Sequence, residues 1–501
     1  MLFRPDRRDF RLIGLYAGRV VFGVGLAMLL PAALAFAVGE RNEAYGFLIG
    51  ASLAVLVGRG TEILLFTRAP VSTSHGLATV ALSWLAAPMF AAVPLLLSGH
   101  YASYLDAYFE AMSGFATIGL TLANDLDHMA RSVNLWRHLM QFLGGQGIII
   151  VVLTLFAAGA AQVGTLYTGE GREEKILPNV IRTARFIWRV ALVYAGIGTL
   201  VLWVTLLLAG MPPLTGLYHA LNLFMAAFDT GGFATQSASV AFYRSPAVES
   251  VLMIIMVAGA FSFPLHYQLW QGKRSEIARN IETRTIGLSI LGLFVVTAVG
   301  LGRTGTFTDF GPLFRHGFFQ AISAHTTTGL STTAGRLFVT DWGVLAPAMI
   351  VAAMAIGGMA GSTAGGIKAI RIGLIVKGLR RDIRKVLLPE NAQVIETYHS
   401  MSRRVLRSDQ VRDAATILLL FLLLYLGGGM LGLFYGYRFD LALFESTAAA
   451  SSGGLSVGIV RPELEWPIKV AYIAQMVIGR LEFIAIFALA GYAVSIVRGR
   501  V

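Results

Sequence analysis

The stretch YLDAYFEAMSGFATIGLTL at residues 104–122 has three counterparts further along the chain. They are LYHALNLFMAAFDTGGFAT at 217–235, LFRHGFFQAISAHTTTGLST at 313–332 and LALFESTAAASSGGLSV at 441–457. Each begins with an amphipathic part and ends in a glycine, an apolar residue and a small residue. We call these stretches the four glycine segments. Self-similarity of this kind predicts a fold built from copies of one unit.

The spacing inside the segments selects one register. Glu110, Gln320 and Glu445 each follow a phenylalanine and lie nine positions before a glycine. The second segment has Leu223 at this position, so the repeat is imperfect there. In the first segment Gly114 offers a rival register, but the shared spacing selects a later glycine. The matched glycines are therefore Gly119, Gly232, Gly329 and Gly454.

The composition is that of a protein with many membrane spans. Of 501 residues, 56% are apolar and 14% are charged, whereas soluble proteins carry about a quarter charged residues. Apolar runs such as 190–208 are long enough to cross the hydrocarbon layer as helices. We expect spanning helices at about 13–38, 46–66, 76–97, 133–158, 187–209, 249–270, 285–301, 342–358 with a continuation to about 375, 413–436 and 467–496.

The glycine segments lie between alternate helices and read as re-entrant loops. They are too short and interrupted to span, yet too apolar for solvated connections. The predicted fold is an all-α polytopic membrane protein, with four helix–pore-loop–helix repeats around a central pore and two extra transmembrane helices before them. The predicted divisions are 1–70 for the extra helices and 71–165, 166–272, 273–400 and 401–501 for the repeats.

The net charge of +12 follows the topology expected in a membrane. Basic residues gather at about 58–75, 161–187, 271–284 and 375–412, and the intervening stretches contain few. Because Lys and Arg are enriched in cytoplasmic loops, these loops and both termini are predicted to be cytoplasmic. The basic excess therefore does not predict nucleic-acid binding. The chain has no cysteine, which excludes disulfides and thiolate metal sites.

The residues around the four glycines are suited to a potassium filter. A potassium ion must exchange its hydration shell for other oxygens, which rings of backbone carbonyls supply where glycine permits the required dihedral angles. Close helix packing explains small residues in one segment, but not at matched positions in four. The predicted ion-binding residues are Ala116, Thr117, Ile118, Gly119, Asp229, Thr230, Gly231, Gly232, Thr326, Thr327, Thr328, Gly329, Ser451, Ser452, Gly453 and Gly454. Potassium itself is expected at Thr117, Ile118, Thr230, Gly231, Thr327, Thr328, Ser452 and Gly453.

A second run of small residues, IGGMAGSTAGGIKAIR at 356–371, interrupts the helix after the third segment. Dense small residues weaken a continuous helix and predict a gate loop lying across the pore. GxxxG-type packing accounts for Gly357 and Gly361 only in part. The predicted gate residues are Ala360, Gly361, Ser362, Thr363, Ala364, Gly365, Gly366 and Arg480.

Several charged and polar side chains carry further expectations. Arg480 lies well inside the last apolar stretch, so it is expected to hydrogen-bond carbonyls of the gate loop or to repel cations. Glu482 is expected to be its helper or its neighbour rather than a proton carrier. Glu110 and Glu445 either attract cations or bind loop amides, and Asp229 beside a filter stretch could attract cations directly. Two more side chains, Arg137 and His138, are expected at the membrane interface.

With these residues in view, the chain resembles the TrkH/KtrB/HKT superfamily of potassium transporters and is most similar to its bacterial TrkH branch. The resemblance covers nearly the whole chain, and its most telling stretches are the four segments, 136–150, 356–371 and 479–490. It implies potassium uptake across the cytoplasmic (inner) membrane of a bacterium. It also implies a homodimer with one pore per subunit and a cytoplasmic nucleotide-binding regulatory subunit of the TrkA type. The transported potassium ion is the expected ligand, and no organic cofactor is expected in this chain.

The sequence departs from the family pattern at a few filter positions. Ala116 and Ile118 stand where threonines are usual, 451–454 replaces an asparagine-rich stretch, and Asp229 stands where an amide is common. These differences do not remove the ring of backbone carbonyls. They concern the selectivity of the filter for potassium over sodium. Relatives that pass sodium often have serine at the first glycine, so Gly119 favours potassium.

Three alternatives remain open at this point. The first is a sodium-permeable or poorly selective member of the same superfamily. The second is a proton- or sodium-coupled secondary transporter, working by symport, which predicts inverted halves and midplane acids rather than a fourfold repeat. The third is a membrane-embedded enzyme, which would need paired His and acidic residues inside the spans. Such residues are only scattered here.

Overall fold

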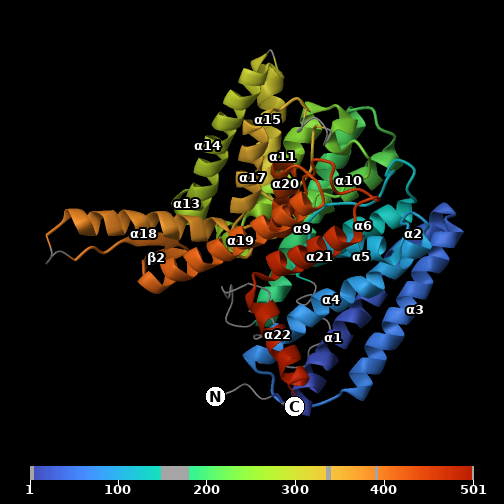
Figure 1. Ribbon diagram of the computed structural model, residues 1–501. Helices are drawn as coiled ribbons and strands as arrows, with labels where there is room; N and C mark the ends of the chain where they lie inside the picture. The colour runs from blue at the N-terminus through green and yellow to red at the C-terminus, as the bar shows by residue number, and fades with distance from the viewer. Residues whose placement is uncertain (1–4, 148–179, 308, 334–339, 390–392, 499–501) are drawn as a thin grey trace.

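The structure, a computed structural model, describes residues 5–147, 180–307, 309–333, 340–389 and 393–498. Within them the regular secondary structure is almost entirely helical (Figure 1). The helices are α1 Arg7–Ala27, α2 Leu29–Val38, α3 Arg41–Leu64, α4 Thr73–Leu97, α5 Tyr104–Phe115, α6 Arg131–Gln146, α9 Val180–Leu208, α10 Pro213–Phe228, η1 Ser239–Tyr243, α11 Pro246–Ala260, α12 Phe263–Trp270, α13 Ser275–Arg279, α14 Ile281–Thr304, α15 Phe310–His325, α17 Leu345–Ile356, α18 Ala369–Leu387, α19 Ser408–Phe434, α20 Phe439–Ser451, α21 Trp466–Leu481 and α22 Ile484–Val497. The strands described, β1 Thr397–Ser400 and β2 Ser402–Val405, form an antiparallel hairpin in which Thr397 pairs with Val405.

The lengths of the described helices fit a polytopic membrane protein. Six of them are long and apolar enough to cross a membrane, or up to eight if each of two bent helix pairs is one span. They carry many exposed apolar side chains, as a lipid-facing surface requires. The predicted all-α membrane fold is therefore what the structure shows. The predicted span 133–158 and the loop 161–187 fall partly outside the described residues.

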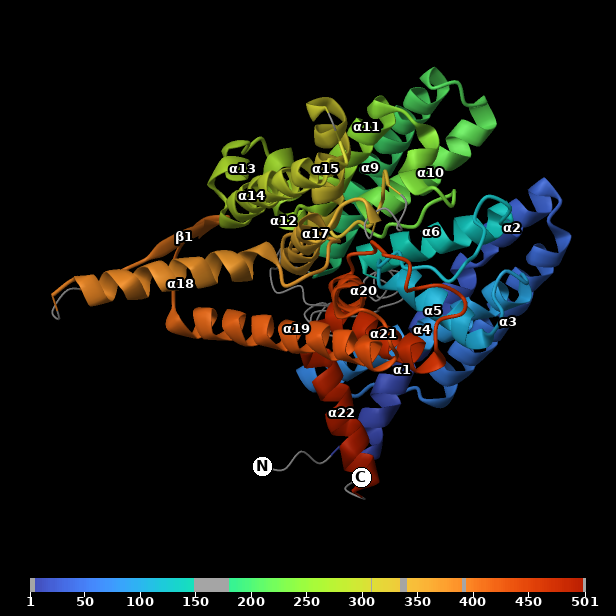
Figure 2. The same cartoon turned by 45° about the horizontal axis from the view of Figure 1, so that its top comes forward.

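The two leading helices pack closely through small residues. The predicted helix 13–38 is divided at Met28 into α1 and α2. Where α1 crosses α3, a side chain at Gly58 would collide with the backbone of Phe22 and Gly18. Small residues at such crossings let membrane helices approach to backbone contact. Helices α1, α3, α4 and α22 lie together at the lower end of the molecule in Figures 1 and 2.

Two predicted continuous helices are wrong, because each is sharply bent. The prediction at 249–270 is α11 followed by α12 at 103°, and that at 467–496 is α21 followed by α22 at 115°. At the first bend Ser262 begins a new helix by accepting a hydrogen bond from the Leu265 amide. At the second, Glu482 and Phe483 have φ of 53° and 72°, which a straight helix cannot contain. Pro264 in the first turn of α12 cannot donate a hydrogen bond to the Ala260 carbonyl, so it contributes to the first bend, whereas no proline or glycine lies at 482–483.

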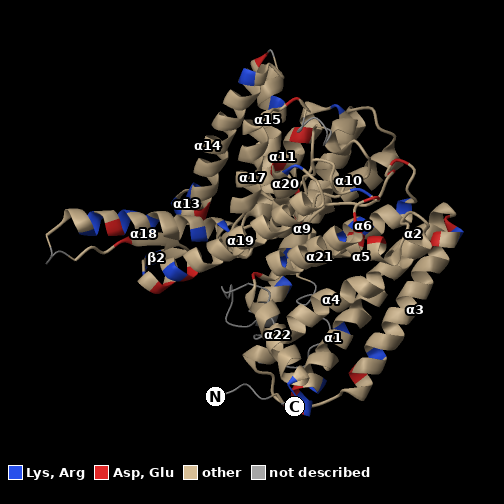
Figure 3. Cartoon of the chain, viewed as in Figure 1, with Lys and Arg blue, Asp and Glu red and all other residues tan. Residues whose placement is uncertain are grey.

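Helix α18 projects from the body and carries much of the positive charge. Figures 1 and 2 show α18 and the start of α19 reaching away from the other helices, with the β1–β2 hairpin beside them. Lys and Arg are frequent along this arm (Figure 3). Lys377 donates a 2.8 Å hydrogen bond to Glu396 before the hairpin and lowers the pKa of that carboxyl group. His399 of β1 is 2.9 Å from Glu276 of α13, so the hairpin is tied to the body.

Candidate ion pathway

The four glycine segments repeat one backbone conformation. Gly119, Gly232, Gly329 and Gly454 have φ of 91°, 75°, 85° and 63°. Two positions earlier, Thr117, Thr230, Thr327 and Ser452 have φ of 51°, 49°, 55° and 58°, and the residue between is not left-handed. Positive φ is uncommon for threonine and serine. Its recurrence at four matched positions shows a conformation imposed by the surrounding structure.

The segments also meet one another in a closed ring. A side chain added at Gly119 would collide with the Gly231 carbonyl, and one at Gly232 with the Thr328 carbonyl. A side chain at Gly329 would meet Gly453 and Gly454, and one at Gly454 would meet the Ile118 carbonyl. Each segment therefore touches the next in chain order, and the fourth touches the first. The glycines are required by this contact as well as by their dihedral angles.

The carbonyls that make these contacts share one position in the repeat. They belong to Ile118, Gly231, Thr328 and Gly453, each directly before a matched glycine. Backbone whose φ alternates in sign turns successive carbonyls toward the same side, as a ring of ion ligands needs. The predicted ion-binding residues of all four segments are therefore brought together. The Asp229 carboxylate lies against Gly145 of α6 and accepts a 2.7 Å hydrogen bond from Gln146.

The acidic residues of the short helices hold the ends of the segments. Glu110 accepts a 3.0 Å hydrogen bond from the Leu122 amide, and Glu445 accepts bonds from the Val457 and Ile459 amides at 3.0 and 3.1 Å. In the third repeat Gln320 donates to the Ser331 hydroxyl at 2.6 Å. Both carboxylates are fully buried. Of the two roles expected for them, the geometry shows amide binding.

Arg137 and His138 are not interfacial, so that prediction was wrong. Both are completely buried, because they lie nearly two turns inside α6 and pack on the second segment. Arg137 forms a 2.8 Å ion pair with Glu110, and His138 lies 3.2 Å from the Phe233 carbonyl. Gln141, one turn further on, donates to the Gly231 carbonyl and accepts from the Phe233 amide.

Sequence reasoning missed two groups of residues around the segments. Gln141 lies within the stretch 136–150 but was not predicted to be a site residue; its one signal was its position one turn after Arg137 on the same helix. The second group comprises glycines of the helices that follow three of the segments. A side chain at Gly144, Gly259 or Gly479 would collide with the carbonyl that ends a short helix. The sequence pattern carries no signal for this packing, because small residues are frequent in all membrane helices.

The predicted interruption at 356–371 is a loop, residues 357–368, between α17 and α18. We call it the small-residue loop. Its Thr363 hydroxyl lies 2.9 Å from the carbonyls of Phe228 and Gly259 in the second repeat. Its Gly365 amide donates a 2.8 Å bond to the Thr327 hydroxyl of the third segment, and a side chain at Gly365 would collide with the Ser451 carbonyl of the fourth. The loop is therefore bonded directly to the ring.

Arg480 connects this loop to the first repeat. Its guanidinium donates to the Thr363 carbonyl at 2.8 Å and to the Gly144 carbonyl at 3.1 Å. It lies at the end of α21, where the helix bends, rather than inside one continuous helix. The expected bond to a loop carbonyl is present. The expectation for Glu482 was only partly right, since it lies near Arg480 in the chain but forms an ion pair with Arg371 of α18.

Three cavities adjoin the ring or the small-residue loop. A cavity of about 410 Å³ is lined by all four matched glycines. A cavity of about 30 Å³, lined by Gly365, Lys368 and Arg480, has space for only a water molecule or two. Another of about 410 Å³ is lined by Gly361 of the loop together with Arg371, Tyr398 and Arg407. The narrow space is thus lined by the loop and Arg480, and it shares Gly361 and Glu482 with the wider cavity beside α18.

Comparison with known proteins gives consistent results. The sequence model of the family described as TrkH, cation transport protein, matches residues 47–491. An uncharacterised cation transporter of Methanocaldococcus jannaschii is 30% identical over 490 residues, which are 97% of this chain and 96% of that protein. The Trk system potassium uptake protein TrkH of Halomonas elongata is 31% identical over 392 residues, 76% of this chain and 77% of that protein. The crystal structure of the potassium transporter TrkH from Vibrio parahaemolyticus has a TM-score of 0.80, covering 95% of this chain and 98% of that chain at 24% identity, which shows a shared fold.

Proposed function

The chain belongs to the TrkH family of cation transport proteins, and we propose that the cation it carries is potassium. Several relatives are named as potassium uptake proteins. Uptake through a pore needs no chemistry in this chain, because an inside-negative membrane potential contributes about 2.3 kcal/mol per charge for each 100 mV. The proposed divisions are the two leading helices at 1–70 and repeats at 71–165, 166–272, 273–400 and 401–501.

One observation carries the proposal: the four glycine segments share a backbone conformation and close into a ring. Four glycine segments in which φ alternates in sign supply stacked rings of carbonyl oxygens. Such rings replace the hydration shell of potassium. The predicted ion-binding residues would form this filter. The side chains behind the segments, Gln141 and Arg137 among them, would keep the backbone from collapsing onto the pore axis.

The small-residue loop and Arg480 are proposed as the gate. The loop bonds to the second and third segments, and Arg480 bonds the loop to α6 of the first repeat. The narrow space between them holds no more than a water molecule or two. A hydrated ion does not fit there, so the loop or the arginine must move before an ion passes. This arrangement supports a gate placed directly below the filter.

The assembly is also a proposal. We expect a homodimer in the cytoplasmic membrane, with both termini in the cytoplasm and a nucleotide-binding regulatory subunit of the TrkA type docked on the basic loops. The projecting α18 supports a protein contact, because its apolar side chains Leu379, Ile383 and Val386 are 61%, 51% and 85% exposed. An unpartnered apolar stripe of this kind is typical of an interaction surface.

The experiment that tests the function is cation flux into proteoliposomes that contain the purified chain. Potassium, rubidium, sodium and lithium are compared, with Gly119→Ser and Gly436→Ser measured alongside. Both glycines have positive φ, 91° and 87°, but only Gly119 has backbone of a neighbouring segment where the side chain would go. We expect potassium and rubidium to be selected, and the selection to be lost in Gly119→Ser alone.

Each other outcome has a defined meaning. Equal sodium flux in the unchanged protein would keep the pore and overturn potassium selectivity. Equal damage by both substitutions would show that backbone strain, rather than the ring, explains the effect. If no cation enters, the same assay with Arg480→Ala decides whether the pore is shut without its partner or absent.

A further inference from the structure

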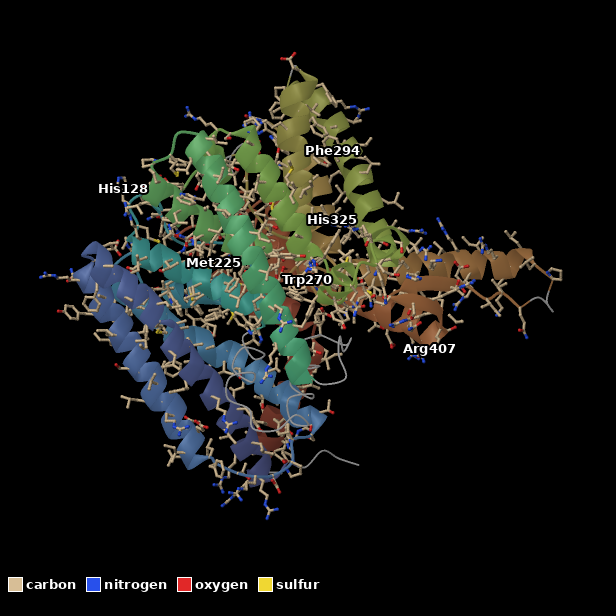
Figure 4. All side chains as sticks on the ribbon, turned by 180° about the vertical axis from the view of Figure 1, so that it is seen from behind. His128, Met225, Trp270, Phe294, His325 and Arg407 are labelled. Carbon is tan, nitrogen blue, oxygen red and sulfur yellow. The ribbon has the colours of Figure 1, made fainter. Side chains whose placement is uncertain are left out.

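A groove on the lipid-facing side of the second repeat lies outside the ion pathway. It has a volume of about 230 Å³ and lies between α9 and α11. Ile197 and Val201 of α9 and Ile254 of α11 form its rims and are 58%, 43% and 70% exposed. In Figure 4, α9 is the green helix in front, with Trp270 beside it. The groove therefore opens to the membrane hydrocarbon.

The floor of the groove is the second pore helix, α10. Phe224 and Phe228 stack with ring centroids 5.3 Å apart. Gly198 of α9 makes room for the first ring, since a side chain there would lie about 2.5 Å from it. The lining is aliphatic and aromatic, so no hydrogen-bonding ligand is favoured. A flexible hydrocarbon chain fits this shape and this chemistry.

Basic side chains at one end of the groove indicate which kind of lipid headgroup the hydrocarbon chain carries. The exposed face of α9 runs from Arg185 and Arg189 through Val193 to Ile197. In the described part of the chain, neither arginine has an ion-pair partner. Trp270 is 42% exposed and donates to Tyr194 at the same end, as aromatic residues do at membrane interfaces. Arg189 is eight residues from Ile197, about 12 Å along a helix, which an acyl chain easily spans.

We propose that this groove binds one acyl chain of an anionic phospholipid, whose headgroup lies on Arg185 and Arg189. The inference takes only the membrane orientation from the proposed function, in which this end of α9 faces the cytoplasm. Anionic lipids are attracted there by basic side chains. The ligand then touches the pore helix that carries the second glycine segment, although it does not enter the pore.

The absence of cysteine allows a direct test in the full-length chain. Ile254→Cys in the groove and Leu288→Cys on lipid-facing α14 are each labelled with bimane, and the protein is placed in nanodiscs. Quenching is then measured with lipids that carry brominated acyl chains and either an anionic or a zwitterionic headgroup. We expect stronger quenching by the anionic lipid at position 254 and no headgroup preference at position 288.

Two sets of variants make the result specific. Replacing Arg185 and Arg189 by Gln should reduce the headgroup preference about fivefold for each arginine. Val201→Trp, which fills the groove, should reduce quenching at position 254, whereas Val204→Trp, with similar exposure on the same helix and outside the lining, should not.

Two results would overturn the proposal. Equal quenching at positions 254 and 288 without headgroup preference would mean ordinary bilayer contact. Quenching at 288 but none at 254 would mean that another part of the protein or a second copy covers the groove. The measurement involves no ion flux, so its failure is distinct from failure of the proposed transport.

Discussion

At the scale of single residues, the polar side chains of the pathway are bound mainly to backbone. Arg480 donates to two carbonyls from different repeats, and the Thr363 hydroxyl lies 2.9 Å from two carbonyls of the second repeat. Irregular backbone inside a membrane needs such partners, because no water is available to satisfy it. Each of these bonds therefore stabilises the irregular backbone of the loop and its neighbours.

Replacing Arg480 tests its two expected roles. We expect Arg480→Ala to raise potassium flux without the partner by about tenfold or more, since hydrogen bonds from charged donors contribute about 1.5–3 kcal/mol each. Arg480→Lys is the matched control, because it keeps the charge and loses the planar fork. High flux in both variants would assign the effect to the two hydrogen bonds. Low flux in the lysine variant would assign it to charge repulsion, and unchanged flux in Arg480→Ala would remove this residue from the gate.

The matched acids Glu110 and Glu445 should differ in their importance for stability. Glu110→Gln leaves Arg137 buried without its counter-charge, and breaking a buried pair costs about 3–5 kcal/mol. Glu445 binds two amides and a hydroxyl, so Glu445→Gln should cost about 1 kcal/mol, and the third repeat already has Gln320 at this position. Thermal unfolding in detergent measures both. Equal losses would contradict the role given to the Arg137 ion pair.

At the scale of elements, the small-residue loop replaces part of a helix in the third repeat. Its backbone groups bond to those that the bend between α11 and α12 leaves free. The Met359 amide donates to the Ala260 carbonyl, and the Phe263 amide donates to the Gly361 carbonyl, both at 3.1 Å. Glu282 of α14 accepts the Ala360 amide at 2.8 Å. The break in one repeat is thus stabilised by the loop of the next.

Substitutions in this loop should distinguish the effect of hydrogen bonds within the loop from the effect of hydrogen bonds to the second repeat. Thr363→Val keeps the shape and removes the hydroxyl bonds to Phe228 and Gly259, so we expect higher partner-independent flux. Ser362→Ala removes only a bond to Met359 inside the loop and should leave flux near the unchanged level. Thr363→Ser should restore low flux. The reverse order of effects would show that the loop is held by its own turns rather than by the second repeat.

At the scale of the whole molecule, ion pairs join neighbouring repeats on the side away from the small-residue loop. Lys469 of the fourth repeat lies 2.6 Å from Asp106 of the first, and Arg315 of the third lies 2.7 Å from Glu249 of the second. The Lys469–Asp106 pair connects the fourth repeat to the first repeat. A ring of four repeats in one polypeptide needs such a closing contact, because covalent connection joins only three of the four boundaries.

The projecting arm gives the prediction at this scale. If the apolar stripe of α18 forms the interface of the proposed homodimer, Leu379→Glu with Ile383→Glu should convert that dimer to a monomer, as measured by light scattering. Arg384→Glu with Lys385→Glu changes the charge of the same helix outside that stripe and should leave the dimer intact. A monomeric unchanged protein, or a dimer in both double variants, would contradict the proposed interface.

The sequence by itself determined the membrane class, the four matched glycines and an interruption within 356–371. Composition, local spacing and small-residue density are properties of short stretches. They can be read from the sequence regardless of how distant parts of the chain fold. The spacing from Glu110, Gln320 and Glu445 located three of the ring glycines, and the shared glycine–apolar–small ending located Gly232.

Only the tertiary structure decided how these pieces meet. Pro264 signals the break near 261–262 locally, but the partners of its freed backbone groups come from the small-residue loop, and the bend at 482–483 has no local breaker and places Glu482 in an ion pair with Arg371. The burial of Arg137 and His138 likewise depends on the second segment, about a hundred residues away. Contacts between residues far apart in the chain depend on packing, and no local pattern contains them.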